Sequence, residues 1–469
     1  MGATKEGAMR RPALSVIGLG KLGAPMAAVL SAKGFTVVGL DLNADFVDAI
    51  NRGSAPVAEP MLQDMIDAGR PRLSATVDYG EAVRNTDVSF IIVPTPSGAD
   101  RFFTNKFVVE AVSQIGQALR GKNDYHLVAV TSTVMPGSTD GEIRHALERA
   151  SGRKVGPDLG LCYNPEFIAL GSVVKDMLRP DMILIGESDA KAGDVLESIY
   201  RASTESNPEF HRMNLVNAEL CKISVNTFVT TKISYANMIA DMCDHLPDAD
   251  ADIVTRAVGA DSRIGRKYLK GAIGYGGPCF PRDNKAFAAL ARSLGVNSDL
   301  AEATDKVNDH QLHRLMGAIE AHAAADSIVA VLGMSYKPMT PVIEESQGVE
   351  LARRLSESGY MVVIADPMAG APAKAVLGDR VNLAESAEAA VSRADIVVVA
   401  TPWSEFAQIS SAAVQRSGNP TVIIDPWGIV QADTTGNARL VRLGRGNWKP
   451  SVTDRSGSAL RAPGARMVR

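Results

Sequence analysis

Cys279 is the side chain whose surroundings point most clearly to chemistry. It follows the glycine-rich run GAIGYGGP and is followed by Pro281, which suits the first turn of a helix. A thiol at a helix N-terminus has a lowered pKa, because unpaired N–H groups and the helix dipole stabilise the thiolate. The pattern therefore predicts a nucleophile rather than a small buried hydrophobe. Cys162, Cys221 and Cys243 lie in apolar or helical stretches and are predicted to be structural.

Two pairs of residues have the spacing of one helical face. Asp283 follows Cys279 by four residues, and Asn226 follows Lys222 by four residues in a segment without glycine or proline. Side chains four residues apart lie on the same side of a helix. Lysines on helices are usually solvated, so the spacing alone favours a surface position for Lys222.

The run GLGKLG at residues 18–23 fits a dinucleotide-binding turn, because an apolar strand precedes it and a helical stretch follows it. The first glycine allows the tight turn, the second lets a pyrophosphate approach, and the third lets helix and strand pack closely. The phosphates would lie at the helix N-terminus. The residues predicted to hold the cofactor here are Gly18, Gly20, Lys21, Leu22 and Gly23.

Two later residues extend the predicted cofactor site. Asp41 ends the next strand, where a carboxylate binds ribose hydroxyls and repels a 2′-phosphate, so the pattern predicts NAD rather than NADP. Thr95 stands where a later strand would end and is predicted to lie beside the cofactor. A hydroxyl that merely stabilises its turn is the alternative interpretation for Thr95.

The elements that must position these residues recur twice along the chain. Each block reads as a strand, a tight turn, a helix, a strand ending in Asp, and a later buried strand. The strands lie at 16–20, 34–41 and 86–96 in the first block, and at 331–335, 359–366 and 394–402 in the second. Continuous β-branched runs are typical of parallel strands covered on both faces. The sequence predicts an α/β protein with two Rossmann-like doubly wound domains. In the second block only one of the three turn glycines is evident, at Gly333.

Helical segments separate the two blocks. Residues 215–245 predict one helix of about 45 Å, a surface suited to self-association. Further helices are predicted over about 284–293 and 300–322. The predicted domains are an NAD-binding domain at 12–210, a central helical and dimerisation region at 211–322, a C-terminal Rossmann-like domain at 323–445, and a flexible tail at 446–469.

The composition narrows the function classes. The net charge is −4 over 469 residues, which argues against a nucleic-acid or acidic-membrane partner. Four cysteines without CxxC pairing favour reduced thiols over disulfides, and no zinc-ligand spacing is evident. The N-terminus reads as a short polar arm rather than a signal peptide, and no apolar run is long enough to cross a bilayer. We expect a soluble, cytoplasmic protein without a metal.

Several motifs together resemble the UDP-glucose/GDP-mannose dehydrogenase family of nucleotide-sugar dehydrogenases, from Leu14 to about Trp427. The motifs are GLGKLG at 18–23, STV at 132–134, NPEF at 164–167, AELCKISVNTF at 218–228, GYGGPCFPRD at 274–283 and GMSYKP at 333–338. The resemblance implies a four-electron oxidation of a nucleotide sugar at its C6 hydroxyl with two NAD. Cys279 would attack the intermediate aldehyde, and the thioester formed by the second oxidation would be hydrolysed.

The resemblance also implies roles for individual residues. Lys222 and Asn226 would stabilise a developing oxyanion. Asp283 and Thr133 would order the catalytic water, with Thr133 also beside the cofactor, and Glu166 would transfer protons during hydrolysis. The residues expected to hold the substrate are Glu166, Lys222, Asn226, Arg263, Tyr268, Gly276 and Lys337, with Arg263 reaching across a dimer formed by the long helix.

Three departures from the family pattern lie at the substrate end. Glu344 and Trp427 stand where the family usually has arginines, and IALG follows NPEF in place of the usual LREG. Arginine is not replaced neutrally where it binds phosphate or carboxylate groups. UDP-glucose is the first expected substrate, followed by UDP-N-acetylhexosamines and GDP-mannose, and another activated primary alcohol is an alternative.

Two rival functions fit parts of the sequence. A β-hydroxyacid dehydrogenase also has a GxGxxG domain followed by a long helix with a lysine, but it uses no nucleophilic cysteine and lacks the second α/β domain. A non-catalytic NAD-binding scaffold would explain the missing arginines.

Overall fold

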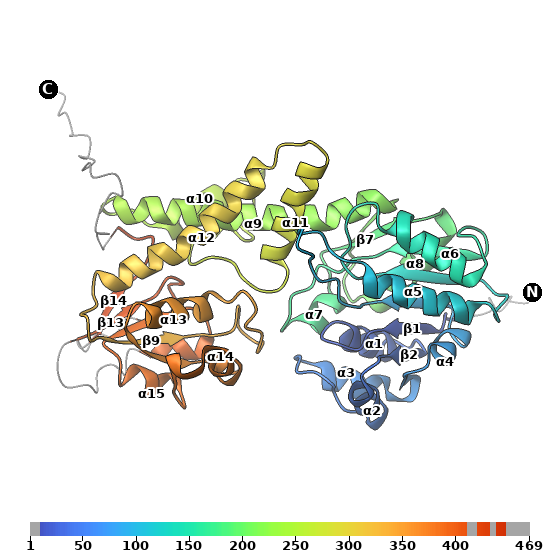
Figure 1. Cartoon of the computed structure of the whole chain (residues 1–469), viewed down its shortest axis with the longest axis horizontal. Coiled ribbons are helices and arrows are strands. Elements are labelled where there is room, and N and C mark those ends of the chain that lie inside the picture. The colour runs from blue at the N-terminus through green and yellow to red at the C-terminus, as the bar shows by residue number, and fades with distance from the viewer. Residues whose placement is uncertain (1–9, 410–419, 432–437, 447–469) are drawn as a thin grey trace, which may run out of the picture. The chain divides into compact units, whose positions relative to one another are not determined.

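A computed structural model describes residues 10–409, 420–431 and 438–446 (Figure 1). The chain divides into two compact units, Met1–Thr227 with Arg282–Ser298, and Phe228–Pro281 with Asp299–Arg469. The predicted polar arm and nearly all of the predicted tail lie outside the described residues. In the described part, no helix combines the length and apolar character that crossing a bilayer requires.

The first unit is built on an eight-stranded sheet in the order β3-β2-β1-β4-β5-β6-β7-β8. Its ladders are parallel except for β6 against β7. The strands are β1 (Leu14–Ile17), β2 (Val37–Leu40), β3 (Leu73–Thr76), β4 (Val88–Ile91), β5 (His126–Val130), β6 (Leu159–Tyr163), β7 (Met182–Glu187) and β8 (Glu209–Asn214). The first six strands have the order of a dinucleotide-binding sheet.

Helices cover both faces of this sheet, so its central strands are buried and largely apolar, with Ser15, Ser89 and His126 as buried polar exceptions. They enclose two apolar clusters, one centred on Val16 and Phe90 and the other on Ile17 and Ile91. The helices are α1 (Gly23–Ala32), α2 (Ala44–Arg52), α3 (Leu62–Gly69), α4 (Tyr79–Arg84), α5 (Lys106–Leu119), α6 (Arg144–Ser151), α7 (Val173–Leu178) and α8 (Ala190–Ser203).

The second unit contains a six-stranded parallel sheet in the order β11-β10-β9-β12-β13-β14. Its strands are β9 (Ile328–Leu332), β10 (Met361–Ala365), β11 (Asn382–Leu383), β12 (Ile396–Val399), β13 (Thr421–Ile424) and β14 (Ala438–Val441). Its helices include α10 (Ala251–Ala260), α12 (Asp299–Glu320), α13 (Gln347–Glu357), α14 (Gly370–Leu377) and α15 (Ala387–Val391). The strand order repeats that of the first sheet, which confirms the predicted pair of Rossmann-like domains.

Two helices belong partly to each unit. The long helix α9 (Leu215–His245) has the predicted bounds, and α11 (Phe280–Ser293) begins four residues earlier than expected. Pro281 thereby lies in the first turn of α11, where its missing N–H costs no hydrogen bond. Because α9 carries Lys222 and Asn226 and α11 carries Asp283, these helices position most of the predicted chemical groups.

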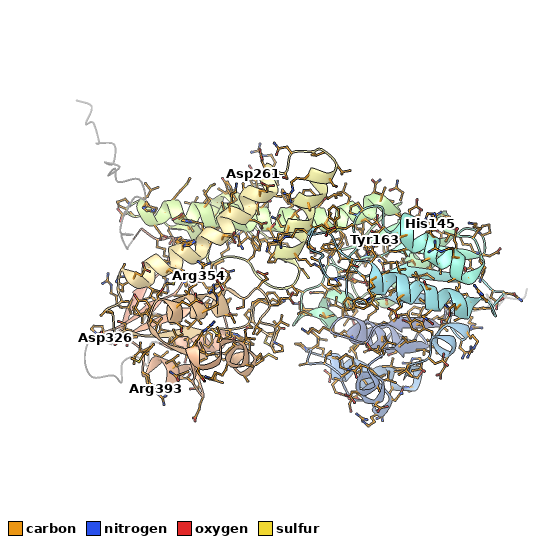
Figure 2. All side chains as sticks on the ribbon, in the orientation of Figure 1. His145, Tyr163, Asp261, Asp326, Arg354 and Arg393 are labelled. Atoms are coloured by element: carbon orange, nitrogen blue, oxygen red, sulfur yellow. The ribbon has the colours of Figure 1, made fainter. Side chains whose placement is uncertain are left out.

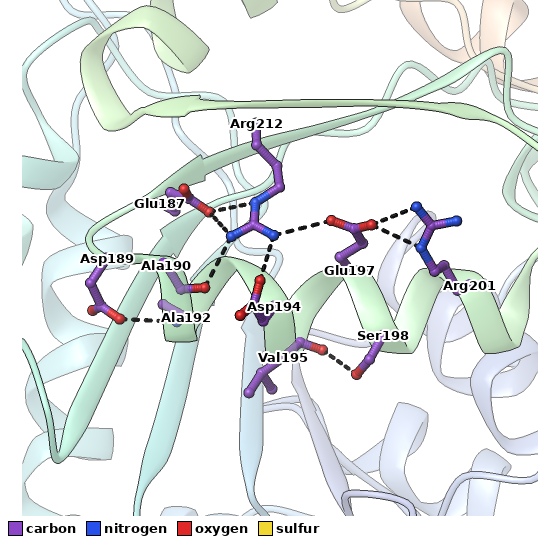
Figure 3. A network of polar contacts seen from close by, with 10 residues as sticks. All are labelled: Glu187, Asp189, Ala190, Ala192, Asp194, Val195, Glu197, Ser198, Arg201 and Arg212. Carbon is purple, nitrogen blue, oxygen red and sulfur yellow. Dashed lines mark hydrogen bonds and ion pairs between the residues drawn. The ribbon is translucent and has the colours of Figure 1, made fainter.

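A charged network fastens α8 to the edge of the first sheet (Figure 3). Arg212 on β8 contacts Glu187 on β7 at 2.8 Å and Asp194 and Glu197 on α8 at 2.6 and 3.2 Å. These carboxylates raise the pKa of Arg212 above its ordinary value. A forked guanidinium shared among three carboxylates holds a helix in one register better than a single surface ion pair does.

Candidate active site

The first unit contains a cavity of about 770 Å³ at the carboxyl ends of β1, β2 and β4. This is the crevice in which a doubly wound sheet binds a dinucleotide. Its wall is formed by Ile17, Gly18, Gly20, Lys21, Leu22, Gly23, Leu40, Asp41, Leu42, Phe46, Tyr79, Ile92, Val93, Pro94, Phe107, Glu110 and Gln114. The structure thus brings the whole predicted glycine-rich turn and Asp41 to one cavity.

The three glycines of the turn have different reasons to be glycine. Gly18 has φ +99°, and a Cβ on it would lie 2.2 Å from the Ile92 carbonyl oxygen. A Cβ on Gly23 would lie 1.8 Å from the carbonyl oxygen of Gly18. Among the described residues, no atom comes within 4 Å of a Cβ placed on Gly20. Gly20 therefore leaves open space, which suits the close approach of a pyrophosphate.

Asp41 helps to shape the turn and keeps acceptor capacity. Its Oδ2 accepts a hydrogen bond from the Leu19 N–H at 2.6 Å, and its Oδ1 accepts one from the Asn43 N–H at 2.8 Å. A carboxylate can accept about four hydrogen bonds. The partly exposed Asp41 can therefore also accept hydrogen bonds from the two hydroxyls of a ribose.

Thr95 joins two loops of the first unit. It is buried, and its hydroxyl donates to the backbone carbonyl of Thr133 at 2.7 Å. Pro94 lines the cofactor cavity, whereas Thr95 is not among its lining residues. The alternative interpretation of Thr95, a hydroxyl that stabilises its turn, agrees with this hydrogen bond.

Lys222 is a buried lysine, with 7% of its surface exposed. Its ammonium group donates to the backbone carbonyl of Glu166 at 2.5 Å and lies 4.6 Å from the centre of the Phe167 ring. The surface position favoured by helical spacing alone is therefore wrong, because tertiary packing brings the 164–167 segment onto this face of α9. A desolvated ammonium group can stabilise a nearby oxyanion far better than a solvated one.

One turn further along α9, Asn226 contacts a buried carboxylate. Its Nδ2 donates to Oδ2 of Asp283 at 2.6 Å, and Asp283 is 1% exposed. The other Asp283 oxygen accepts hydrogen bonds from Arg282. Arg282 also donates to the Thr95 carbonyl at 3.3 Å and lies over the Phe103 ring at 4.4 Å. Arg282 was not predicted from the sequence, although a basic residue beside Asp283 was a visible signal.

Glu219 is a second overlooked residue on the same face of α9. It is fully buried and accepts hydrogen bonds from the N–H groups of Gly137 at 2.6 Å and Thr139 at 2.7 Å. Burial raises the pKa of Glu219. The carboxyl group thus holds the loop that follows Thr133. The spacing of Glu219, Lys222 and Asn226 along one helix face could have identified it.

Glu166 lies in a polar cluster with two further residues of the first unit. Its Oε1 lies 2.6 Å from the hydroxyl oxygen of Tyr200, which lies 2.6 Å from Oδ1 of Asn164. Burial raises the pKa of Glu166, against the opposing effects of Tyr200 and Lys222. Tyr200 was not predicted from the sequence, because nothing in the local pattern of α8 distinguishes it from a core aromatic residue.

In the second unit, Cys279 is exposed and directly precedes α11. The glycine-rich loop before it is held by Tyr275, whose N–H donates to Asn308 Oδ1 and whose hydroxyl donates to Asp305 Oδ1, both at 2.7 Å. A Cβ on Gly276 would lie 2.1 Å from the carbonyl oxygen of Glu345. This glycine therefore permits close packing of its own loop against the 344–346 segment.

The remaining predicted substrate residues of the second unit lie at its surface or are partly buried. Arg263 is exposed and forms a 2.6 Å ion pair with Asp261. Figure 2 labels the position of Asp261. Tyr268 has φ +63° and is 52% exposed, with its ring edge-on to Phe280. Lys337 is partly buried, with its ammonium group 5.9 Å from the centre of the Tyr336 ring.

The two positions that depart from the family pattern have different surroundings. Glu344 has an exposed side chain, and its carbonyl accepts a hydrogen bond from the Gly277 N–H at 3.2 Å. Trp427 packs against the core of the second sheet, and its indole N–H donates to the Ala400 carbonyl at 3.2 Å. Trp427 thus fills space inside its domain, which an arginine reaching for an anion would not do.

Comparison with known proteins supports this description along most of the chain. Residues 13–204 match the NAD binding domain of the UDP-glucose/GDP-mannose dehydrogenase family, residues 216–310 its central domain, and residues 330–432 its UDP binding domain. The chain is 37% identical over 401 residues to UDP-glucose 6-dehydrogenase AglM of Haloferax volcanii, covering 84% of this chain and 92% of that protein.

Two further relatives cover similar parts of the chain. GDP-mannose 6-dehydrogenase of Pseudomonas putida is 34% identical over 368 residues, which span 75% of this chain and 80% of that protein. A solved UDP-glucose dehydrogenase from Pyrobaculum islandicum superposes with a TM-score of 0.84 at 33% identity, covering 95% of this chain and all of that one. The chain belongs to the UDP-glucose/GDP-mannose dehydrogenase family and is an NAD-dependent nucleotide-sugar dehydrogenase.

Proposed function

We propose that this enzyme oxidises the C6 primary alcohol of a nucleotide sugar to a carboxylate through a covalent intermediate on Cys279. The main support is the pair of buried polar contacts on one face of α9, Lys222 with the Glu166 segment and Asn226 with Asp283. Both lie in the unit that contains the cofactor cavity. Asp283 follows Cys279 by four residues, at the start of α11.

The proposed chemistry has three stages. The residues of the glycine-rich turn would hold NAD, which would supply the hydride acceptor for each of two oxidations. After the first, the Cys279 thiolate bonds to the aldehyde carbon and the carbonyl oxygen becomes an oxyanion, which Lys222 and Asn226 stabilise. Loss of the second hydride leaves a thioester on Cys279. Water then adds to the thioester carbon and the C–S bond breaks, releasing the carboxylate and the thiol.

The hydrolysis stage is assigned to three residues. Asp283 and Thr133 orient the water, and Glu166 transfers a proton. Asp283 suits this role because Asn226 and Arg282 hold its carboxylate from both sides. A water molecule held by a fixed carboxylate gains reactivity from its orientation as well as from proton transfer.

UDP-glucose is the proposed substrate, supported by the 37% identity to a UDP-glucose 6-dehydrogenase. Arg263, Tyr268, Gly276 and Lys337 are the residues that we propose to hold it. A UDP-N-acetylhexosamine ranks second and GDP-mannose third. The inward-packed Trp427 and the acidic Glu344 each remove a positive charge, so we expect the sugar selectivity to differ from that of relatives with arginine at these positions.

The decisive experiment counts NADH per sugar. Incubation with NAD and each of a panel of UDP- and GDP-sugars should yield two NADH per uronate formed with the true substrate. Cys279→Ala should lower carboxylate formation by at least about a thousandfold, the scale seen when a nucleophile is removed. Cys243→Ala, which changes a buried thiol, is the matched control and should stay active. One NADH per substrate, or normal carboxylate formation by Cys279→Ala, would exclude the covalent route.

NAD binding without turnover on any sugar of the panel would instead support the non-catalytic scaffold.

A nucleophilic thiol must also stay reduced, which supports a cytoplasmic setting.

We also propose that a second copy of this chain packs against α9. Phe228, Tyr235 and Met242 are spaced by seven residues and are 66%, 45% and 52% exposed. Leu246 and Ile253 continue the exposed apolar side chains at 57% and 66%. Large apolar side chains that are exposed at heptad spacing along a helix are typical of helix-mediated association between subunits.

Light scattering tests this proposal. The native protein should have at least twice the chain mass, and Phe228→Lys with Met242→Lys should give monomers. Leu294→Lys, at a 68% exposed leucine outside α9, is the control. A monomeric native protein would contradict the dimer.

A further inference from the structure

The cluster of Glu166, Tyr200 and Asn164 contains one more acceptor than its donors can satisfy if Glu166 is ionised. The Tyr200 oxygen lies 2.6 Å from both the Glu166 carboxyl oxygen and the Asn164 side-chain oxygen. A phenol carries one proton, so it can donate to only one of them. In the other 2.6 Å contact, the proton must come from the residue that faces Tyr200, because two oxygens without a proton between them would repel at that distance.

The orientation of Asn164 decides which contact contains the extra proton. Its Nδ2 donates to the backbone carbonyl of Leu184 on β7 at 3.0 Å. If the amide were flipped, the Asn164 side-chain oxygen would face the Leu184 carbonyl oxygen and the two would repel. Oδ1 must therefore face Tyr200. An amide oxygen has no proton to give. Tyr200 therefore donates to Asn164, and the proton between Tyr200 and Glu166 belongs to Glu166.

The surroundings of Glu166 favour a neutral carboxyl group. Together with Tyr200 it borders a small cavity of about 20 Å³, where helices α1 and α7 and strand β4 contribute the apolar side chains of Met26, Val29, Leu30, Met177 and Phe90. Ser203 completes the wall. An ionised carboxylate beside such a wall is poorly solvated.

Charged and titratable groups act on Glu166 from two helices. Lys222 on α9 favours the carboxylate, as would a hydrogen bond donated by Tyr200, whereas burial favours the acid and has the larger effect on the pKa of Glu166. Because Tyr200 gives its proton to Asn164, its contact with Glu166 does not favour the carboxylate. Tyr200 on α8 has a pKa raised well above its ordinary value by burial and by Glu166, so it remains a phenol. Glu166 is therefore the member of the cluster that can titrate, with a pKa above its ordinary value.

Tyr200 is also held firmly enough to impose this arrangement. It is 7% exposed, and its helix is fastened to β7 and β8 through the Arg212 network (Figure 3). The Asp189 side chain accepts from the Ala192 N–H and caps the start of the same helix. Because Tyr200 is buried, rotating its phenol away from Glu166 would displace the side chains packed around it.

We propose that Asn164 and Tyr200 keep Glu166 protonated in the resting enzyme, so that Glu166 begins the reaction as a proton donor and not as a base. Tyr200 is then a positioning residue that acts through Glu166. The catalytic part of this inference rests on the proposed function. The water oxygen bonds to the thioester carbon and the C–S electron pair goes to sulfur. The Glu166 proton goes to the thiolate and one water proton goes to Asp283.

Infrared difference spectroscopy of the protein without substrate tests the protonation directly. At pH 7 the native enzyme should show a carboxylic-acid C=O band that is absent from Glu166→Gln. Raising the pH should remove the band with a midpoint above the ordinary range for glutamate. No such band at pH 7 would overturn the proposal, and this comparison decides it even if the tyrosine variant fails to fold.

Tyr200→Phe tests the direction in which the titration midpoint of Glu166 moves. If Glu166 donates to Tyr200, deleting the hydroxyl removes the acceptor of its proton, and the midpoint should fall by about one pH unit, a tenfold change in the ionisation constant. If instead Tyr200 donates to a carboxylate, the same deletion should raise the midpoint, which would contradict the proposal. Tyr125→Phe, which deletes a buried hydroxyl elsewhere in the same unit, should leave it unchanged.

The pH profile of kcat links the protonation to turnover. The alkaline limb should move to lower pH in Tyr200→Phe and should not move in Tyr125→Phe. A shifted infrared midpoint with an unshifted alkaline limb would show that Glu166 is protonated but is not the donor. The NADH stoichiometry is measured separately, so failure of the covalent route and failure of this inference give different results.

Discussion

The two Rossmann-like domains share a strand order but differ in the turn where a dinucleotide would bind. In the first, Gly18 and Gly23 are five residues apart, and in the second, Gly333 and Gly348 are fifteen apart. A Cβ on Gly23 would lie 1.8 Å from the Gly18 carbonyl oxygen, and a Cβ on Gly348 would lie 2.0 Å from that of Gly333. The second turn therefore keeps two of the glycines, with ten extra residues between them. The expectation that only Gly333 remained was wrong.

The acidic residue at the end of the second strand shows why the two turns differ in function. Asp41 accepts hydrogen bonds from two backbone N–H groups of the described residues. Its counterpart Asp366 accepts six, from the N–H groups of Met334, Ser335, Met368 and Ala369, the Ser335 hydroxyl and the Trp403 indole. In the second domain, groups of the protein itself thus use the acceptor capacity that Asp41 keeps available for a ribose in the first.

The largest effect should come from the glycines that the two turns share. Gly23→Ala and Gly348→Ala should each cost at least about 2 kcal/mol of domain stability, because the new methyl group meets a backbone carbonyl. Only Gly23→Ala should also abolish NAD binding. Calorimetric titration with NAD measures the affinity, and thermal unfolding measures the stability. Unchanged NAD affinity in Gly23→Ala would contradict the proposed difference between the two turns.

Substituting Asp41 should affect NAD binding, whereas substituting Asp366 should affect the stability of the second domain. Asp41→Ala should weaken NAD binding by about 10- to 100-fold, since charge-assisted hydrogen bonds contribute about 1.5–3 kcal/mol. Asp366→Ala should leave NAD affinity unchanged and lower the unfolding midpoint of the second domain. Among the described residues, tryptophan occurs at Trp403 and Trp427, both in the second domain, so the change in their fluorescence on unfolding reports that domain. Weakened NAD binding in Asp366→Ala would contradict the assignment.

A buried histidine should make the first domain more sensitive to acid than the second. His126 is fully buried, contacts the Ser89 hydroxyl at 2.9 Å, and has its pKa lowered to about 3 by burial. At the positions of Ser15 and Ser89, which bond to each other at 2.7 Å, the second domain has the apolar Ala330 and Val397.

A histidine with a lowered pKa stabilises the fold at high pH and loses this contribution as the pH falls. The first domain should therefore lose about 1.4 kcal/mol of stability per pH unit between pH 6.5 and about 3, because the unfolded histidine takes up the proton first. Urea unfolding at pH 7 and 5, followed by circular dichroism and by tryptophan fluorescence, should show the loss mainly in the first domain. His126→Gln should reduce it, and equal losses in both domains would contradict the prediction.

The smallest effect is expected at Ser335, which replaces the open Gly20. Ser335→Gly removes one hydroxyl from a crowded pocket and should cost roughly 1 kcal/mol. NAD stoichiometry should remain one per chain, because Asp366 still accepts hydrogen bonds from the Trp403 indole and four backbone N–H groups. A second equivalent of bound NAD would show that one side chain had excluded it.

Local patterns were sufficient for the elements and for the first turn. Apolar periodicity predicted α9 with its bounds, the strand repeats predicted both sheets, and the spacing of Gly18, Gly20 and Gly23 predicted the cofactor cavity. These features depend on neighbours along the chain, which the sequence displays directly. The family resemblance added Lys222 and Glu166, which local spacing alone had left unassigned.

Contacts between distant segments were decided only by tertiary structure. Lys222 is buried because the 164–167 segment packs on α9, and Glu166 meets Tyr200 because α8 is fastened beside it. Gly348 closes on Gly333 across a ten-residue insertion that no fixed-spacing motif describes. The sequence alone determined which backbone each segment can adopt, because that choice is local. Which polar groups lose water and must share protons was decided by packing, because burial depends on residues far away in the chain.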